Sequence, residues 1–321
     1  MSATSSQGQG GATWLKERGF GAAFRVSLGL ANAPDVRRYP YWHIDLHSGS
    51  GTNENVGCDG SPIVFLNEYE RSPRPGPLRA FFCDADAQRL HGLAARVGGA
   101  AFCFNCDNGE ILPVVSEAIA AAERRPWKSV GSIVIDPNGY LDESTVPYAA
   151  LREFCVKHPR MDLMLNLNVR VYKMSKGLQR KGQHGWQSKL LPRVDQFGEL
   201  FCRKHWLISD VRRPGGDSFV MLIGRNMRTG DHRALGFHHL ESARGRDNVD
   251  EIEFSKGDIA VAARADSQRA LFDVSRVSGP PGLSRGASGG HAPRQLALPV
   301  SKLRQSGNRG APQLVLPMGS V

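Results

Sequence analysis

Five apolar runs between residues 41 and 168 alternate with stretches of helical periodicity. Apolar positions at helical spacing follow the second, third and fourth runs. The runs cover residues 41–46, 78–86, 100–107, 131–140 and 161–168, and the helical stretches cover residues 87–97, 110–125 and 145–158. This repeated order of strand and helix is typical of βα units, so it predicts a largely parallel sheet.

The runs at residues 41–46, 100–105 and 131–136 show almost no alternation of polar and apolar residues. Strands buried on both faces have this pattern, as in a sheet covered by helices on each side. Two later runs, residues 205–211 and 218–226, flank Arg-Arg-Pro-Gly-Gly-Asp, which is a hairpin signal. We therefore expect an α/β fold with a Rossmann-like, doubly wound sheet that ends in an antiparallel hairpin. A long helix is expected just before the hairpin, over residues 186–203.

Composition divides the chain into three parts. Residues 1–13 are rich in Gly, Ser and Gln, and residues 273–321 are too poor in large apolar side chains to order themselves, which leaves a folded domain over 14–272. The net charge is +10, and the chain from residue 274 onward contributes six Lys and Arg residues and no acid. This basic tail can hold a polyanion such as nucleic acid, or it can serve only as a solubilising appendage.

No apolar run reaches the roughly 18 residues that a membrane span requires, so no membrane partner is expected. The N-terminal residues lack a signal-peptide pattern, and a cytoplasmic location is expected. The six cysteines do not form a disulfide framework in a chain this long, and several lie in apolar runs where buried thiols are usual. Cys103 and Cys106 have metal-like spacing, but no second pair accompanies them, and no metal site is expected. His238 and His239 alternate faces if they lie in a strand, so they cannot both bind one ion.

Polar residues follow the end of each of the first four predicted strands, and ligands of such sheets bind beyond these ends. Taken singly, a Gly-x-Gly turn needs no ligand, and an acid at a strand end is commonly a helix N-cap. All four together, in order, favour a nucleoside-type ligand. The four segments are Asp45-Leu46-His47-Ser48-Gly49-Ser50-Gly51, Asp84-Ala85-Asp86, Asn105-Cys106-Asp107-Asn108-Gly109 and Asp136-Pro137-Asn138-Gly139-Tyr140.

The residue types suggest how such a ligand is held. Gly49 and Gly51 allow the backbone to turn and to approach a ligand closely. The carboxylate of Asp84 can accept hydrogen bonds from both hydroxyls of a ribose, and the polar set that begins at Asn105 suits an adenine edge. Glu54 replaces the third glycine of a dinucleotide fingerprint and would repel a pyrophosphate, which disfavours a nicotinamide-dependent oxidoreductase.

S-adenosylmethionine is cationic and carries no phosphate, so it suits these residues better, and Asp45 could meet its amine directly or through water. The segment from Asp45 to Gly51 is similar to motif I of class I S-adenosylmethionine-dependent methyltransferases. More narrowly, residues 35–255 resemble the three-Cys-motif partner protein (TcmP) family and related phage or mobile-element proteins. The further shared segments are Gly60-Ser61-Pro62, Ile135-Asp136-Pro137-Asn138-Gly139, Trp206-Leu207-Ile208 and Ile223-Gly224-Arg225-Asn226.

This resemblance implies a methyltransferase fold, S-adenosylmethionine as cofactor and a three-Cys-motif protein as partner. The cofactor-binding residues that it implies are Asp45, Leu46, His47, Ser48, Gly49, Gly51, Asp84, Ala85, Asn105 and Asp107. Two departures stand out: His47 replaces the usual aromatic residue or glycine, and a long insertion separates Gly49 from Asp84. The insertion is expected to hold a helix around residues 63–66, either as an extra surface element or as a substrate lid.

Asp136, Pro137, Asn138 and Gly139 form the expected catalytic segment. In adenine-N6 methyltransferases the same place carries an acid or amide, two prolines and an aromatic residue, and the target amine donates to the first side chain and to a backbone carbonyl. Asp136 and the carbonyl of Pro137 could accept in this way. Asn138 replaces the second proline and Tyr140 lies one place late, so the methyl acceptor stays open. Methyl transfer mainly requires alignment of the acceptor with the methyl group.

A basic run after the fifth strand is expected in a loop on the substrate side, with Trp186 as a possible stacking surface for a base, or as an ordinary solvated loop. Its cations are Lys173, Lys176, Arg180 and Lys181. The alternative function is a non-catalytic partner scaffold that keeps the fold and associates with nucleic acid through its basic tail.

Overall fold

The computed structural model of the chain describes residues 13–33, 36, 39–53, 57–73, 77–137, 146–180, 193–211, 219–227, 230, 232–253 and 313–315. The chain divides into two compact units, residues 1–255 with 311–321 and residues 256–310, and every described residue belongs to the first unit. Within the described residues, no helix has the length and the apolar character that crossing a membrane would require.

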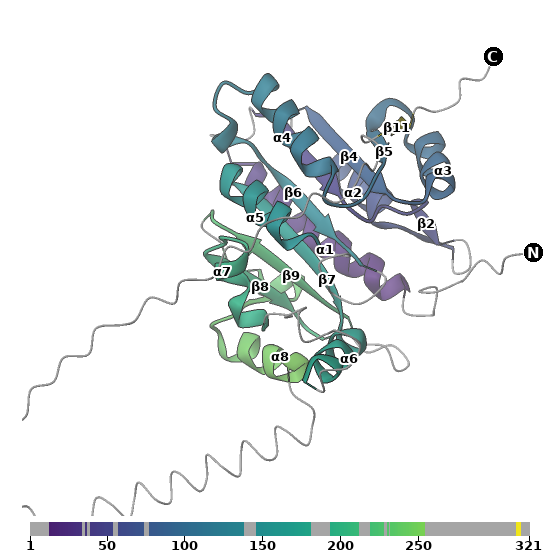
Figure 1. Cartoon of the computed structure of the whole chain (residues 1–321). Helices are drawn as coiled ribbons and strands as arrows, with labels where there is room; N and C mark the ends of the chain where they lie inside the picture. The colour runs from purple at the N-terminus through teal and green to yellow at the C-terminus, as the bar shows by residue number, and fades with distance from the viewer. Residues whose placement is uncertain are drawn as a thin grey trace, which may run out of the picture. The chain divides into compact units, whose positions relative to one another are not determined.

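A nine-stranded sheet lies at the centre of the first unit (Figure 1). Its strand order is β10-β8-β9-β7-β6-β1-β4-β5-β11. The strands are β1 Tyr41–Asp45, β4 Leu78–Asp84, β5 Phe102–Asn105, β6 Val130–Ile135, β7 Met161–Asn168, β8 His205–Ser209, β9 Phe219–Arg225, β10 Phe237–His239 and β11 Gln313–Val315. Two short strands, β2 Thr52–Asn53 and β3 Cys58–Asp59, form a separate antiparallel pair.

Strands β5, β4, β1, β6 and β7 are parallel. Strand β9 lies antiparallel between β7 and β8. The chain fills the sheet outward from β1 through β4 to β5, and then returns to the other side of β1 to form β6 and β7. The strand order therefore switches between β1 and β6, where ligands of such sheets bind. This is the Rossmann-like, doubly wound sheet of the class I methyltransferase type, with the C-terminal antiparallel hairpin, that the sequence predicts.

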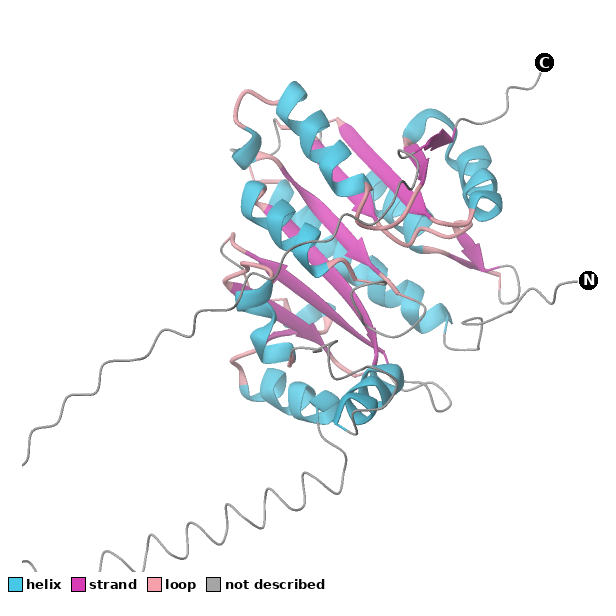
Figure 2. Cartoon of the chain, in the orientation of Figure 1, coloured by secondary structure: helices cyan, strands magenta, loops and turns pink. Residues whose placement is uncertain are grey.

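Helices cover both faces of the sheet, as Figure 2 shows by helices in front of and behind the strands. Helices α1 Thr13–Ala31 and α2 Ser61–Arg71 bury Phe20, Phe24 and Phe65 against one face. Helix α3 Ala87–Val97 packs on β4 and β5. The opposite face is covered by α4 Ile111–Ala122, α5 Tyr148–Lys157, α6 Val169–Arg180, α7 Phe197–Leu200 and α8 Ala243–Glu253. Successive residues of β1 alternate between the two faces, which explains why its apolar run is continuous.

Two predicted elements differ from the structure. The long helix expected over 186–203 is wrong in its described part, because residues 193–203 contain only a 3-10 turn, Val194–Gln196, and the four-residue helix α7. The basic run that begins at Lys173 lies partly in α6 rather than in a loop, because Val169, Tyr172 and Ser175 recur at helical spacing and are buried. Lys181 and Trp186 lie outside the described residues.

Residues 1–12 and 254–312 lie outside the described residues, and with them most of the predicted tail. Three residues of that tail, Gln313–Val315, form β11 and pair antiparallel with β5, which the sequence did not predict. The helix predicted around residues 63–66 is present as α2.

Candidate functional site

The carboxyl ends of the parallel strands bring the predicted polar segments to one edge of the sheet. Asp45 ends β1, Asp84 ends β4 and Asn105 ends β5, while Asp136 follows β6 directly. Parallel neighbours place their ends side by side, and the register pairs Asp84 with Asn105. The structure therefore brings these four residues together as the sequence analysis expects.

Three hydrogen bonds connect the loop after β1 to the end of β4. The backbone N–H and the side-chain hydroxyl of Ser48 both donate to the carbonyl of Cys83, at 3.0 Å each. The N–H of Gly49 donates to Oδ2 of Asp84 at 2.8 Å. Leu46 is buried in the core beneath the loop. The loop is thus held at a fixed position over the carboxyl edge.

The two glycines of this loop have different surroundings. Both have positive φ, +59° at Gly49 and +70° at Gly51, a region that favours glycine. Among the described residues, a Cβ atom at Gly49 would meet nothing within 4 Å beyond its chain neighbours, whereas one at Gly51 would lie 2.6 Å from Cδ1 of Leu93 and 3.2 Å from Ile63. Gly49 therefore borders open space that a ligand can enter, and Gly51 permits close packing of α2 and α3.

Asp45 supports the loop from within the protein. Its side chain is fully buried, and it accepts hydrogen bonds from the N–H of His47 at 3.0 Å and from Oγ of Ser61 at 2.6 Å. Burial raises the pKa of Asp45 to about 7, against the hydrogen bonds from Ser61 and His47, which favour the ionised form. With no exposed surface, the carboxylate does not reach a ligand directly in this structure. It joins the loop to the start of α2.

Asp84 keeps capacity for further hydrogen bonds. Its Oδ1 accepts the N–H of Asp86 at 2.8 Å and its Oδ2 accepts that of Gly49. An ionised carboxylate offers about four acceptor positions, so positions remain for hydroxyls. The helix N-cap is the next acid, Asp86, which accepts from the N–H groups of Gln88 and Arg89. The exposed Ala85 lies between the two acids.

His47 connects the ends of β5 and β6. Its Nδ1 accepts the N–H of Asp136 at 3.3 Å, and its Nε2 faces the side-chain amide of Asn108 at 2.7 Å. Nearby, Asn105 donates to the carbonyl of Asp84 at 3.0 Å, and Asp107 is exposed. The histidine that replaces the usual residue of motif I therefore has a structural role at this edge.

Asp136 is held by two residues that the sequence analysis did not assign to the site. Nζ of Lys16 lies 2.5 Å from its Oδ2, and Nδ2 of Asn166 donates to its Oδ1 at 2.8 Å. Asn166 is a polar residue inside the apolar run of β7, which is a signal that could have identified it. Lys16 comes from α1, which the sequence analysis missed. Pro137 is buried beside Asp136, and Asn138 and Gly139 lie outside the described residues.

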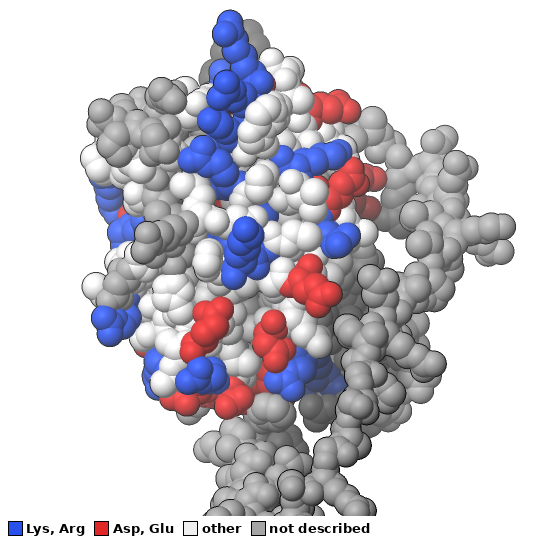
Figure 3. All heavy atoms as spheres, turned by 90° about the vertical axis from the view of Figure 1, so that its left-hand side faces the viewer, with Lys and Arg blue, Asp and Glu red and all other residues white. Residues whose placement is uncertain are grey.

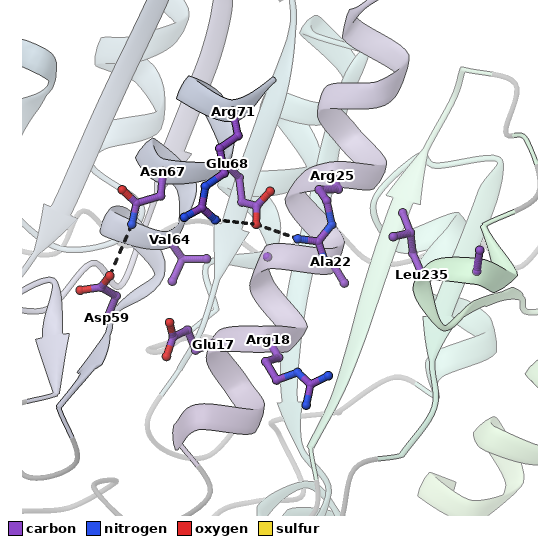
Figure 4. A pocket seen from close by; sticks show the side chains of 12 residues that line it. Glu17, Arg18, Ala22, Arg25, Asp59, Val64, Asn67, Glu68, Arg71 and Leu235 are labelled. Carbon is purple, nitrogen blue, oxygen red and sulfur yellow. Dashed lines mark hydrogen bonds and ion pairs between the residues drawn. The ribbon is translucent and has the colours of Figure 1, made fainter. Parts of the chain in front are cut away.

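A separate hollow of about 730 Å³ lies on the outer side of α1 and α2 (Figure 4). Its wall carries an ion pair between Arg25 and Glu68 at 2.7 Å, and Asn67 donates to Asp59 at 3.4 Å. The residues that line it carry charges of both signs and include none of the predicted cofactor residues. This hollow is therefore distinct from the carboxyl edge.

The cysteines are mostly buried, as predicted: Cys83, Cys103, Cys106 and Cys155 all lie in the interior. Sγ of Cys83 lies 3.2 Å from Sγ of Cys106, and this contact together with burial raises the pKa of Cys83. Within the described part of the chain, no group of three His, Cys, Asp or Glu residues could hold a metal ion. His238 occupies β10 and lies 3.4 Å from Asp210.

The chain is similar to several solved structures at low sequence identity. No family model and no curated protein matches the chain. A Legionella pneumophila protein of family model DUF519 is 14% identical with a TM-score of 0.44, and the match covers 68% of this chain and 87% of that one. A 16S rRNA (adenine(1408)-N(1))-methyltransferase from Catenulisporales acidiphilia is 12% identical with a TM-score of 0.31, covering 66% and 93%. A putative class I S-adenosylmethionine-dependent methyltransferase from Listeria monocytogenes is 13% identical with a TM-score of 0.35, covering 67% and 61%.

All three TM-scores are below 0.5, so the fold assignment depends on the strand order and connections of this chain. The reversed strand β9 between β7 and β8, and the order switch beside β1, define the class I methyltransferase type of Rossmann-like sheet.

Proposed function

We propose that the chain is an S-adenosylmethionine-dependent methyltransferase, with the cofactor over the carboxyl ends of β1, β4 and β5. The observation that carries this proposal is the bond between Gly49 and Asp84 beside open space. Within the described part of the chain, no atom beyond the chain neighbours of Gly49 lies within 4 Å of its Cβ position, and the adjoining carboxylate retains acceptor positions. A glycine turn and an acid at neighbouring strand ends provide room for a nucleoside and a partner for its hydroxyls.

The residues present fit the adenosyl group in chemical type. Asp84 would accept hydrogen bonds from the ribose hydroxyls, while Asn105 and Asp107 would face the base. Leu46, His47, Ser48 and Ala85 would contribute the remaining contacts at the ends of β1 and β4. Asp45 acts indirectly by fixing the loop through Ser61. S-adenosylmethionine, when bound, supplies an electrophilic methyl group on a positively charged sulfur.

The substrate side of the site would be formed by the segment from Asp136 to Gly139. Lys16 and Asn166 fix the orientation of the Asp136 carboxylate, which could accept a hydrogen bond from an acceptor amine. The carbonyl of Pro137 is a second acceptor on the same segment. These residues would position the acceptor rather than react with it, since methyl transfer depends mainly on alignment.

We further propose that the chain is a TcmP-like protein of a mobile element, which the motifs of the sequence support. This assignment would give the chain a three-Cys-motif protein as partner. The basic tail, residues 273–321, would add contact with nucleic acid through its six cations and absence of acids from residue 274 onward.

Calorimetry with S-adenosylhomocysteine tests the cofactor assignment. Wild type should bind, and Asp84→Ala should weaken binding at least about tenfold, the equivalent of one lost strong hydrogen bond. Asp195→Asn is the matched control, because Asp195 is an exposed acid in a surface ion pair with Arg193. Absence of binding by folded wild type, or equal binding by Asp84→Ala, would overturn the assignment.

A non-catalytic scaffold is the second candidate, and the contact between Lys16 and Asp136 favours it. The carboxylate expected to face the acceptor is already paired with a cation of α1. Transfer of labelled methyl groups to DNA, RNA and protein of a host lysate separates the two. An enzyme labels at least one fraction, whereas a scaffold labels none even when S-adenosylhomocysteine binds.

A further inference from the structure

Trp127 exposes 55% of its surface, more than Phe102, the other markedly exposed aromatic residue of the described chain. It lies on the 3-10 turn Pro126–Lys128, immediately before β6 and at the edge of the sheet opposite the candidate cofactor site. A tryptophan left in water retains a large apolar face that a partner can cover.

The turn that carries Trp127 is held in place from both sides. Nδ1 of His158 lies 3.4 Å from the carbonyl of Pro126, and Nε2 of the same ring lies 2.9 Å from Oγ of Ser116. The N–H of Lys128 donates to the carbonyl of Arg125 at 2.8 Å. Residues of α4 and of the end of α5 thus fix the backbone of the turn, and the indole is presented from a defined position.

Several cations lie close to Trp127 in the sequence, and a further one starts a neighbouring strand at the same edge of the sheet. Arg124 and Arg125 are exposed and Lys128 is half-buried on the same segment. None of these three forms an ion pair with another described residue. Arg160 precedes β7, whose Met161 is in register with Gly131 of β6, so its backbone lies level with Val130, two residues after the turn.

Lys204 extends this basic surface toward β8. The neighbouring Arg203 donates to the carbonyl of Cys155 at 2.9 Å and to that of His158 at 3.4 Å, so Lys204 lies near the end of α5. Figure 3 views this side of the molecule and shows Lys and Arg gathered over its upper half. At the opposite, carboxyl edge Asp84 and Asp107 reach the surface, whereas Asp45 and Asp136 are buried.

We propose that this amino-edge surface, formed by Arg124, Arg125, Trp127, Lys128, Arg160 and Lys204, binds single-stranded nucleic acid. The cations neutralise phosphates, and the indole of Trp127 stacks on an unpaired base. An exposed indole near cations suits a flat base that stacks on it. Val156 and Phe102 are also exposed toward this edge of the sheet, so a lipid bilayer is the rival that the test must separate. The surface is separate from the cofactor site, and binding here does not require S-adenosylmethionine.

Fluorescence anisotropy of the full-length chain with a labelled oligothymidine and a labelled oligoadenosine RNA tests the proposal over a salt series. Trp127→Ala should weaken binding at least about fivefold, the lower limit of one stacked base. Arg124→Ala with Arg125→Ala should lower the slope of log affinity against log salt by about two. Met174→Ala and Arg89→Ala are matched controls, an exposed apolar residue and an exposed cation on other elements, and should bind as wild type.

Two results would overturn the proposal. One is equal affinity and equal salt slope in wild type, Trp127→Ala and the double arginine variant, which would assign any binding to other parts of the chain. The other is binding of the wild-type chain to anionic phospholipid vesicles that is lost in Trp127→Ala, while the same change leaves the affinity for both oligonucleotides unaltered. Circular dichroism should show that the variants are folded, since Trp127 is exposed and contributes little to the core.

Discussion

Asp84 accepts the backbone N–H of Gly49 at 2.8 Å, and this bond joins the carboxyl ends of β1 and β4. The same carboxylate accepts the N–H of Asp86 through its other oxygen. The acid at the end of β4 therefore positions the glycine loop and retains acceptor capacity for a ligand. Gly49 lies on the ligand side of this loop and Gly51 packs against α2 and α3, so alanine at the two positions should have different effects.

Gly51→Ala should destabilise the protein more than Gly49→Ala. Both changes place alanine at positive φ, which costs roughly 1–2 kcal/mol. Only Gly51→Ala also brings a Cβ within 2.6 Å of Leu93, and such overpacking costs a further 1–3 kcal/mol or so. Thermal unfolding measures the difference. Gly49→Ala should instead weaken S-adenosylhomocysteine binding, because its methyl group enters the open space. Equal melting temperatures for the two variants would contradict this account.

Asp45→Asn should change how stability depends on pH. Burial raises the pKa of Asp45 to about 7 from an ordinary value of 3.8. Between these values the folded chain holds a proton that the unfolded chain has released. The stability from Asp45 is thus fully present below pH 3.8 and is lost as the pH rises through about 7, with a limit of about 4 kcal/mol at 1.36 kcal/mol per unit.

Denaturant unfolding of wild type and Asp45→Asn from pH 4 to pH 8 measures this contribution as a difference. Burial lowers the pKa of His43 and of His158, so the folded protein loses stability through these groups as the pH falls. This effect has the opposite sign to that of Asp45. These histidines are unchanged in the variant, and their effect cancels in the difference. Wild type should lose stability relative to Asp45→Asn as the pH rises. Parallel profiles would show that Asp45 does not titrate in this range.

Asp162→Asn should be strongly destabilising. Asp162 pairs with Arg225, whose side chain is fully buried between β7 and β9, and Nε of Arg225 donates to its Oδ1 at 3.2 Å. Removing one partner of a buried pair leaves an uncompensated charge and costs about 3–5 kcal/mol. Glu153→Gln breaks the exposed pair with Lys157 and should cost under about 0.5 kcal/mol. Similar unfolding free energies for the two variants would contradict the claim that the Asp162–Arg225 pair is buried and the Glu153–Lys157 pair is exposed.

Lys16→Met should destabilise the contact of α1 with the carboxyl edge. The carboxylate of Asp136 is largely buried and would lose its cation while Asn166 remains. A cost of about 1–3 kcal/mol is expected, below that of a fully buried pair. Adding Asp136→Asn to Lys16→Met should recover part of this loss, because the buried charge is then removed. A double variant less stable than the sum of the single changes would argue against the pairing.

The central sheet could be predicted because local signals agree with the tertiary structure. The largely apolar run of β7 gave both of its ends, Met161 and Asn168. Helix α3 was predicted with its bounds because Asp86 caps its start and Gly98 follows its end. The switch in strand order could be anticipated because parallel βα units have few alternative arrangements.

Helix α1 was not predicted because Gly19, Gly21 and Gly29 lower its helix propensity. Burial of its apolar face against the sheet overrides that local preference, and Phe20 and Phe24 lie in the core. For the same reason the contact of Lys16 with Asp136 could not be found from the sequence. Polar strand ends identified one edge of the sheet, but distant segments supply Lys16 and Ser61 to it.

Hydrogen exchange with and without S-adenosylhomocysteine tests the central claim, a nucleoside site at the carboxyl edge, most directly. Mass spectrometry of peptides should show slower exchange on ligand addition at residues 46–51, 84–86 and 105–108. Peptides of the amino edge, around residues 124–130, serve as the internal control and should not change. Unaltered exchange in all three loops at saturating ligand, or protection confined to other elements, would contradict the account.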